Sequence, residues 1–188
     1  MELGIAAGLQ DRVVQTYGGL VHMDFSAATP VYTPMDPALL PPMYLCYNRH
    51  AGGESGKVHS TVKERWAARD PALVDGMRAQ GALADAAAAA LRAGDATHLA
   101  ALMSQNFAGR RRMYGDGPVG ALNIAMVALA GAHGLSAKFT GSGGALVCVH
   151  ADGGGWLSDL AEAAATEAFA EHGFHLERLR HVISTSSN

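Results

Sequence analysis

The chain has 188 residues, 49% of them apolar, and a formal net charge of −3 at pH 7. This length and apolar content suffice for one domain with a substantial core and a smaller second part. The weak negative charge gives no electrostatic basis for binding nucleic acid or an anionic membrane surface. The sequence has neither a long apolar run nor a basic-then-apolar leader, so we expect a cytoplasmic protein with no membrane partner.

The N-terminal third is predicted to hold a helix and two strands separated by a proline-rich crossing. Val13, Val14 and Tyr17 fit one face of a helix, which Gly18-Gly19 would end. Residues 20–25 then have the pattern of a short strand. Five of the seven prolines fall in residues 26–42, which predicts an irregular crossing between domains. Residues 43–47 are predicted to form a buried strand.

The remainder of the chain is predicted to be mostly helical, with further strands near its end. Cys46 and Cys148 lie in apolar, strand-like runs, which predicts buried free thiols rather than a disulfide or a metal pair. This order of elements favours an α+β fold, in which a small antiparallel sheet carries helices on one face. The expected elements are helices over residues 60–69, 72–92, 97–112, 118–133 and 157–171, and strands over residues 145–150 and 175–182.

The segment from Lys138 to Gly144, KFTGSGG, is the strongest candidate for a ligand site. Glycine leaves no Cβ in the way of a ligand and permits left-handed backbone angles. Successive N–H groups in such a turn can form a concave anion-binding nest. One interpretation is therefore a phosphate or substrate loop formed by Thr140, Gly141, Ser142, Gly143 and Gly144. The alternative is an ordinary glycine-rich turn that joins a helix to a strand.

Asp11 is the candidate catalytic residue, since it stands near the start of the first predicted helix. A carboxylate at this position can accept a proton from a substrate hydroxyl. The alternative is a surface charge that stabilises the positive end of the helix dipole.

These segments together resemble the GHMP kinase superfamily of small-molecule kinases. That family combines an aspartate in a Gly-x-x-Asp helix start, a following Gly-Gly and strand, and a late Lys-x-Thr-Gly-x-Gly-Gly loop. Within it, the sequence is most similar to the plant-type glucuronokinases. The similar stretches include GLQDRVVQTYGG, SGKVHS, NFAGRRRMYGD and KFTGSGG, and they cover residues 2 to about 150.

The resemblance implies the C-terminal half of a kinase. The family's main nucleotide loop, Pro-x-x-x-Gly-Leu-Ser-Ser-Ser, occurs nowhere in the 188 residues. We therefore expect residues 1–36 to be a remnant of the N-terminal domain and residues 37–188 to be the GHMP C-terminal domain. A truncated gene model, an expressed fragment and a degenerate paralogue remain alternatives for the missing half.

The activity implied by the resemblance is phosphoryl transfer from MgATP to the anomeric hydroxyl of D-glucuronate, which gives D-glucuronate 1-phosphate. Asp11 would orient the acceptor hydroxyl and take its proton, while Gly18 and Gly19 would let the backbone turn beneath the substrate. Two other functions stay open: a non-catalytic module with the same fold, and a kinase for another sugar such as galacturonate. The oligomeric state is not predicted.

Two further basic positions are candidates for substrate binding. Lys57 belongs to the similar stretch SGKVHS and would border the cleft, although Val58 replaces the Ser or Thr that a Walker loop requires. In the run at residues 110–112 one arginine, for which we choose Arg111, would bind the carboxylate of the sugar acid through its planar fork. The nine histidines show no metal-ligand spacing, so we expect no metal site in this chain.

Overall fold

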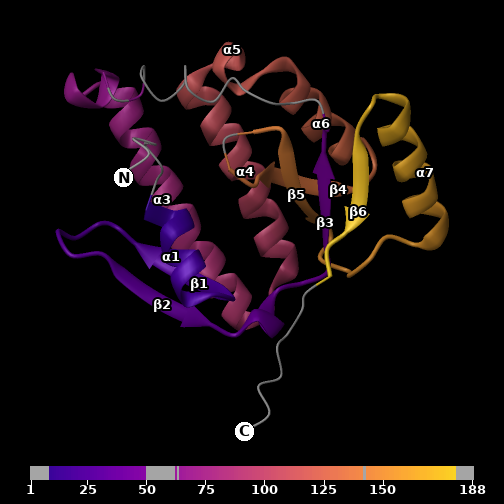
Figure 1. Cartoon of the computed structure of the whole chain (residues 1–188), viewed down its shortest axis with the longest axis horizontal. Helices are drawn as coiled ribbons and strands as arrows, with labels where there is room; N and C mark the ends of the chain where they lie inside the picture. Colours follow the sequence, from indigo (N-terminus) through magenta and orange to yellow (C-terminus); the bar gives the residue numbers. More distant parts are fainter. Residues whose placement is uncertain (1–8, 50–61, 63, 142, 181–188) are drawn as a thin grey trace, which may run out of the picture. The chain divides into compact units, whose positions relative to one another are not determined.

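The computed structural model describes residues 9–49, 62, 64–141 and 143–180 of the chain (Figure 1). These residues form two compact units, residues 9–39 and residues 40–180. The units divide after Leu39, whereas the sequence predicts a domain boundary after residue 36.

The first unit is a helix followed by a two-stranded hairpin. Helix α1 (Leu9–Tyr17) ends where the N–H of Gly18 donates to the carbonyl of Val14 at 2.8 Å. Strand β1 pairs antiparallel with β2, from Leu20 opposite Met35 to Asp24 opposite Val31. The other elements of this unit are β1 (Leu20–Asp24), β2 (Val31–Met35) and the short 3-10 helix η1 (Pro37–Leu39).

Strand β2 corrects the prediction of an irregular crossing over residues 26–42. Pro34 lies opposite Val21 in the hairpin, and a proline is tolerated on an edge strand because no neighbouring strand needs its missing N–H. The aromatic ring of Tyr32 contacts the rings of Tyr17 and Phe25 edge-on, with centroids 5.9 and 6.0 Å apart. The density of prolines therefore concealed a strand that β-branched and aromatic residues stabilise.

The second unit packs helices against a four-stranded antiparallel sheet with the order β4-β5-β3-β6. This confirms the expected α+β class with a small antiparallel sheet. Residues 64–67 are helical, within the helix predicted over residues 60–69. The remaining elements are β3 (Met43–Tyr47), α3 (Pro71–Ala93), α4 (Ala96–Tyr114), α5 (Asp116–Val119), α6 (Ala121–Ala132), β4 (Leu135–Phe139), β5 (Ala145–His150), α7 (Asp159–Glu171) and β6 (His175–Arg178).

The core of the second unit lies on one face of this sheet. Buried strand residues such as Cys46, Leu146 and Phe139 form a continuous cluster with Met126 from α6 and Phe169 from α7. On the opposite face, only Val149 is fully buried among the described strand residues. Helices α4, α6 and α7 therefore cover the face on which most of the strand side chains are buried (Figure 1).

The sequence analysis did not predict strand β4, and it placed the glycine loop directly after a helix. Leu135, Ala137 and Phe139 alternate with more polar residues, which is the period of a half-buried strand. The glycine-rich segment therefore joins two antiparallel strands, and the helix-to-strand interpretation is wrong. The single helix expected over residues 118–133 is also wrong, because the chain breaks at Gly120 between α5 and α6.

The predicted helix ends and thiols are confirmed elsewhere in this unit. The carboxylate of Asp95 accepts a hydrogen bond from the N–H of His98 at 2.9 Å and so caps α4. Thr97, another residue at the start of this helix, donates from its hydroxyl to the carbonyl of Asp152 at 2.6 Å. Cys46 and Cys148 are buried free thiols, and burial raises the pKa of Cys46 to about 12.

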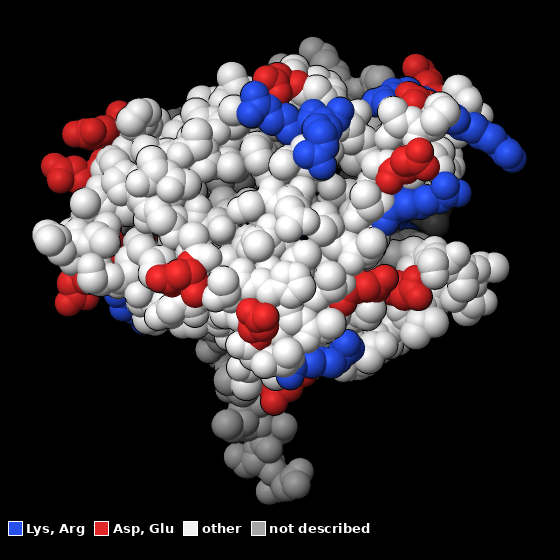
Figure 2. Space-filling view, turned by 180° about the vertical axis from the view of Figure 1, so that it is seen from behind, with Lys and Arg blue, Asp and Glu red and all other residues white. Residues whose placement is uncertain are grey.

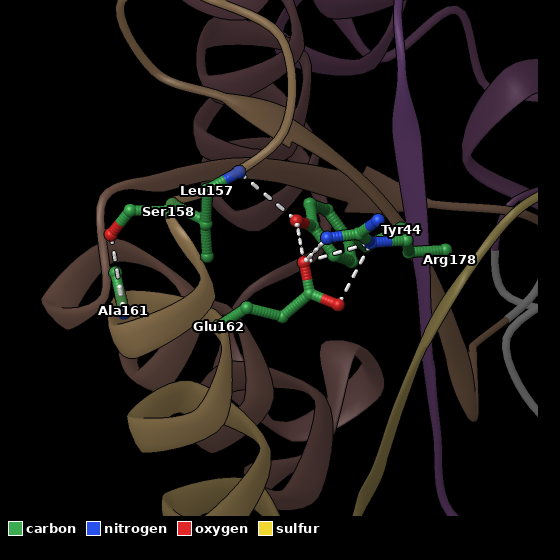
Figure 3. A network of polar contacts seen from close by, with 6 residues as sticks. All are labelled: Tyr44, Leu157, Ser158, Ala161, Glu162 and Arg178. Atoms are coloured by element: carbon green, nitrogen blue, oxygen red, sulfur yellow. Dashed lines mark hydrogen bonds and ion pairs between the residues drawn. The ribbon is translucent and has the colours of Figure 1, made fainter.

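A polar network ties β3, β6 and the start of α7 together (Figure 3). The Tyr44 hydroxyl donates to a carboxylate oxygen of Glu162 at 2.6 Å and accepts from the N–H of Leu157 at 3.1 Å. Arg178 donates to both oxygens of Glu162, at 2.8 and 2.6 Å. Burial raises the pKa of Glu162, but hydrogen bonds from Arg178 and Tyr44 lower it by more, so the net pKa is below its usual value. The carboxylate is therefore charged and fully engaged at neutral pH.

Candidate active site

The glycine loop, residues 140–144, forms the turn of the hairpin between β4 and β5. The N–H of Thr140 donates to the carbonyl of Ala145 at 3.2 Å, which closes the base of the turn. Thr140 and Gly141 are exposed, while Gly143 and Gly144 are half-buried. Ser142 lies outside the described residues. The loop thus presents a short, exposed stretch of backbone at the end of the sheet.

Asn123 in the first turn of α6 anchors the loop. Its Oδ1 accepts from the N–H of Gly144 at 2.8 Å, and its Nδ2 donates to the carbonyl of Val119 at 2.7 Å. A Cβ on Gly143 would lie only 2.8 Å from the Asn123 Nδ2, so glycine is required there for this contact. From the sheet side, the N–H of Asn48 donates to the carbonyl of Gly144 at 3.1 Å. The half of the loop nearer β5 is therefore held in place by its own chain.

Gly141 has a different environment from Gly143 and Gly144. A Cβ built on Gly141 meets nothing within 4 Å, and its backbone is outside the left-handed region. Gly143 and Gly144, in contrast, have φ angles of 134° and 81°. Within the described part of the chain, neither packing nor backbone angle requires glycine at position 141.

Two cations stand where the loop begins. Lys138 donates from its Nζ to the carbonyl of Phe139 at 2.7 Å. Arg110 in α4 places its Cζ 4.8 Å from the centroid of the Phe139 ring and 5.7 Å from that of Tyr114. Burial lowers the pKa of both cations, and the charge of Arg110 lowers that of Lys138 further.

The arginine run separates into residues with different roles. Arg111 forms a two-point ion pair with Asp116, in which its Nη2 donates at 2.8 Å, and this partner raises the pKa of Arg111. Arg111 and Arg112 are exposed, while Arg110 is half-buried against the residue before the glycine loop. Of the three arginines, the structure places Arg110 at the loop and gives Arg111 a carboxylate of its own.

The other predicted site residues belong to the first unit or lie outside the described residues. Asp11 is exposed in the first turn of α1. Gly18 and Gly19 have φ angles of 67° and 60°, and a Cβ on Gly19 would lie 3.3 Å from the Cγ of Pro37. Lys57 lies outside the described residues.

The described residues hold no group of three or more His, Cys, Asp or Glu side chains arranged to bind a metal ion. None of the described helices is both long and apolar enough to span a membrane. On the face shown in Figure 2, acidic and basic side chains are interspersed around a largely uncharged surface.

Two curated proteins from Arabidopsis thaliana are similar in sequence to this chain. Glucuronokinase 1 is 47% identical over 174 residues, and probable glucuronokinase 2 is 46% identical over 175 residues. The chain is a homologue of the glucuronokinases. Each alignment covers 89% of this chain and 48% of the relative, so this glucuronokinase homologue spans about half the length of the curated relatives it matches. No family model matches the chain.

Solved structures show the same fold. The L. major mevalonate kinase, solved in complex with R-mevalonate, has a TM-score of 0.61 at 22% identity, and covers 89% of this glucuronokinase homologue and 50% of the mevalonate kinase. A Lin0012 protein from Listeria innocua has a TM-score of 0.61 at 11% identity, covering 76% of this chain and 42% of that protein. The fold is thus that of a GHMP kinase, and the resemblance stated from the sequence is confirmed.

Three residues of this glucuronokinase homologue were missed as parts of the loop site: Asn123, Arg110 and Lys138. Asn123 could have been noticed as a polar side chain three residues after a helix-breaking glycine, a position that favours local hydrogen bonds to backbone. Lys138 lies in the recognised loop motif but was given no role. The position of Arg110 beside Phe139 depends on packing between α4 and β4, and no local pattern reveals it.

Proposed function

We propose that this chain contributes the sugar-binding and phosphate-loop part of an ATP-dependent sugar 1-kinase whose substrate is D-glucuronate. The observation that carries the proposal is the 47% identity with glucuronokinase 1 over 89% of this chain. Because that match spans 48% of the relative, the remaining half of such an enzyme would supply the main nucleotide-binding loop. The small-molecule partners are then a sugar acid and ATP.

In this reaction the anomeric hydroxyl of the sugar attacks the γ-phosphorus, and the bond from that phosphorus to the bridging oxygen of ADP breaks. MgATP supplies the phosphoryl group and the magnesium charge that neutralises it. Asp11 is proposed to orient the attacking hydroxyl and accept its proton. Its exposed position in the first turn of α1 leaves the carboxylate accessible to a substrate. General-base help of this kind is worth about 10²–10⁴-fold in rate.

The glycine loop is proposed to bind phosphoryl oxygens through its backbone. Asn123 and Asn48 fix Gly144, so the loop needs little rearrangement when a ligand binds. The open space at Gly141 supports this role, because a missing side chain at an exposed loop position lets a ligand approach the backbone closely. Gly18 and Gly19 are proposed to let the backbone turn beneath the sugar, and Lys57 is proposed to border the cleft. Arg111 already pairs with Asp116, so the contact predicted for it falls to another arginine of the run.

The test is a chimaera in which the half of Arabidopsis glucuronokinase 1 that this chain does not match precedes the chain. With MgATP, we expect D-glucuronate to be converted to D-glucuronate 1-phosphate, detected by ³¹P NMR, with slower turnover of D-galacturonate. A folded chimaera that binds ATP but phosphorylates neither sugar acid would contradict the kinase proposal and favour a non-catalytic module.

The role of Asp11 is tested by the change Asp11→Asn in the same chimaera. Turnover is expected to fall about 10²–10⁴-fold while ATP affinity is retained, because the amide cannot accept the proton. Asp159→Asn is the matched control, since Asp159 is also an exposed carboxylate in the first turn of a helix. If Asp11→Asn turns over at close to the rate of the parent, Asp11 is not the catalytic base and serves only as a charge at the end of the helix.

A further inference from the structure

Arg110 and Lys138 converge on a single residue, Phe139, although they come from different elements. The Lys138 ammonium contacts the carbonyl of Phe139 at 2.7 Å, and the Arg110 guanidinium contacts its ring at 4.8 Å. Phe139 is the last residue of β4, so the glycine loop begins at the next residue. Two positive groups therefore stand at the entrance to an exposed stretch of backbone.

These two cations lack the kind of partner that several other arginines of the second unit have. Arg65, Arg111 and Arg178, for example, each pair with a carboxylate, from Asp70, Asp116 and Glu162 respectively. Within the described residues, the structure gives no carboxylate partner to Arg110 or Lys138, although both are half-buried.

Holding two like charges close together with partial loss of water is unfavourable unless an anion offsets them. The lowered pKa values of both groups have the same origin, since they reflect burial and, for Lys138, the neighbouring positive charge. The buried ring of Phe139 packs against the ring of Phe107 in α4, with centroids 5.6 Å apart, and this contact holds α4 and β4 together. The two charges are therefore fixed in the fold and lack an internal counter-charge among the described residues.

We infer that Arg110 and Lys138 form a binding site for an anionic group of the ligand, at the mouth of the glycine loop. Guanidinium offers a planar fork that matches a carboxylate or phosphate, and the ammonium adds a compact charge beside it. The identity of the ligand rests on the proposed function: the anion is either the carboxylate of the sugar acid or a phosphate of the nucleotide. Arg110, rather than Arg111, then fills the anion-binding role expected of the arginine run.

The test uses the ¹⁵N-labelled full chain titrated separately with D-glucuronate, neutral D-glucose and inorganic tripolyphosphate. Arg110→Gln and Lys138→Gln are each expected to weaken the binding of the anion by about tenfold or more, because a charge-assisted hydrogen bond is lost. Arg112→Gln is the matched control, since Arg112 is an exposed residue of the same helix. Any binding of D-glucose should be the same in all variants.

The two sources of the anion give different patterns. Weakened binding of D-glucuronate alone identifies the site as one for the sugar carboxylate, while weakened binding of tripolyphosphate alone assigns it to the nucleotide. Either pattern supports the inference. Unchanged affinity for both anions in Arg110→Gln and Lys138→Gln, or no saturable binding of either anion to the parent chain, would overturn it.

Two further variants separate charge from packing. Lys138→Arg keeps the positive charge and should retain binding, whereas Lys138→Met keeps much of the aliphatic stem and should lose it. The same binding in both, with an unchanged amide spectrum, would mean that Lys138 has only a packing role. The kinase proposal is judged independently by turnover of the chimaera. If the chimaera does not turn over but Arg110 and Lys138 still bind the anion, the kinase proposal is rejected and the proposal of an anion site stands.

Discussion

The two units of the chain bury their apolar side chains to very different degrees. In the first unit Val13 is the only buried apolar residue among those described, while Leu9, Tyr17 and Val31 are 51%, 52% and 54% exposed. The second unit contains the whole of the described sheet-and-helix core, including fully buried Phe169. One helix and a two-stranded hairpin are marginal by themselves in water, whereas a four-stranded sheet covered by helices is not.

This difference separates stability from the proposed chemistry. The candidate base Asp11 belongs to the unit with little core of its own, and the glycine loop belongs to the unit with a complete one. We therefore expect substitutions in the second unit to change the free energy of unfolding most. Substitutions in the first unit should act mainly on ligand binding and turnover.

The largest effect is expected from Phe169→Ala. Phe169 is completely buried in the core cluster, so the change removes a large apolar side chain and leaves a cavity. The free energy of unfolding, measured by urea denaturation, should fall by about 3–5 kcal/mol. Leu160→Ala on the same helix should change it by less than about 0.5 kcal/mol, since Leu160 is 82% exposed.

Urea denaturation of Val13→Ala tests whether the stability of the second unit is independent of the first. If the second unit owes its stability to its own core, this change leaves the main unfolding transition where it is in the parent. A loss comparable to that of Phe169→Ala would show that the two units unfold as one cooperative body.

A smaller loss is expected from Tyr44→Phe. The ring still fills its buried position, but the hydroxyl that accepts from Leu157 and donates to Glu162 is removed. The N–H of Leu157 then lacks this partner at a buried site, which costs about 1–3 kcal/mol. The measurement is again urea denaturation, with Tyr47→Phe as control because the Tyr47 hydroxyl bonds to the exposed Glu177. Equal losses for the two variants would mean that burial of the network does not matter.

Much of the fold could be predicted from local pattern. The helices expected over residues 72–92 and 97–112 correspond to α3 and α4, whose ends differ from these bounds by one or two residues. Strand β2 was missed because Pro34 and the prolines on either side of the strand outweighed its β-branched residues. Strand β4 was missed because its five residues lie between Gly134 and the glycine loop. In both cases the decisive stabilisation is pairing with a strand elsewhere in the chain, which local pattern does not contain.

The only part of the site that could be predicted from the sequence is the glycine loop itself. The KFTGSGG motif revealed the loop, but not that Asn123 anchors it or that Arg110 packs against Phe139. Three successive arginines on a helix point in different directions, and helical periodicity alone does not tell which of them faces β4. That choice depends on how α4 packs, since Arg111 faces Asp116 at the start of the next helix instead.

The smallest effects on stability, and the sharpest separation of structure from function, are expected within the glycine loop. Gly144→Ala puts a Cβ on a residue with a φ angle of 81°, which should lower the free energy of unfolding by about 1–2 kcal/mol. Gly141→Ala should change it by less than about 0.5 kcal/mol, because a Cβ there meets nothing within 4 Å and the backbone angle is an ordinary one.

Ligand binding, in contrast to stability, should be sensitive to a substitution at Gly141. If the open space at Gly141 is where a phosphoryl group approaches the backbone, then Gly141→Ala lowers the affinity for tripolyphosphate and the turnover of the chimaera without destabilising the fold. Gly143 offers no such test, since a Cβ there would displace Asn123 and disturb the loop directly. Equal stability together with unchanged binding in Gly141→Ala would mean that the ligand approaches the loop elsewhere. The close backbone contact would then have to come from the residues that Asn123 holds in place.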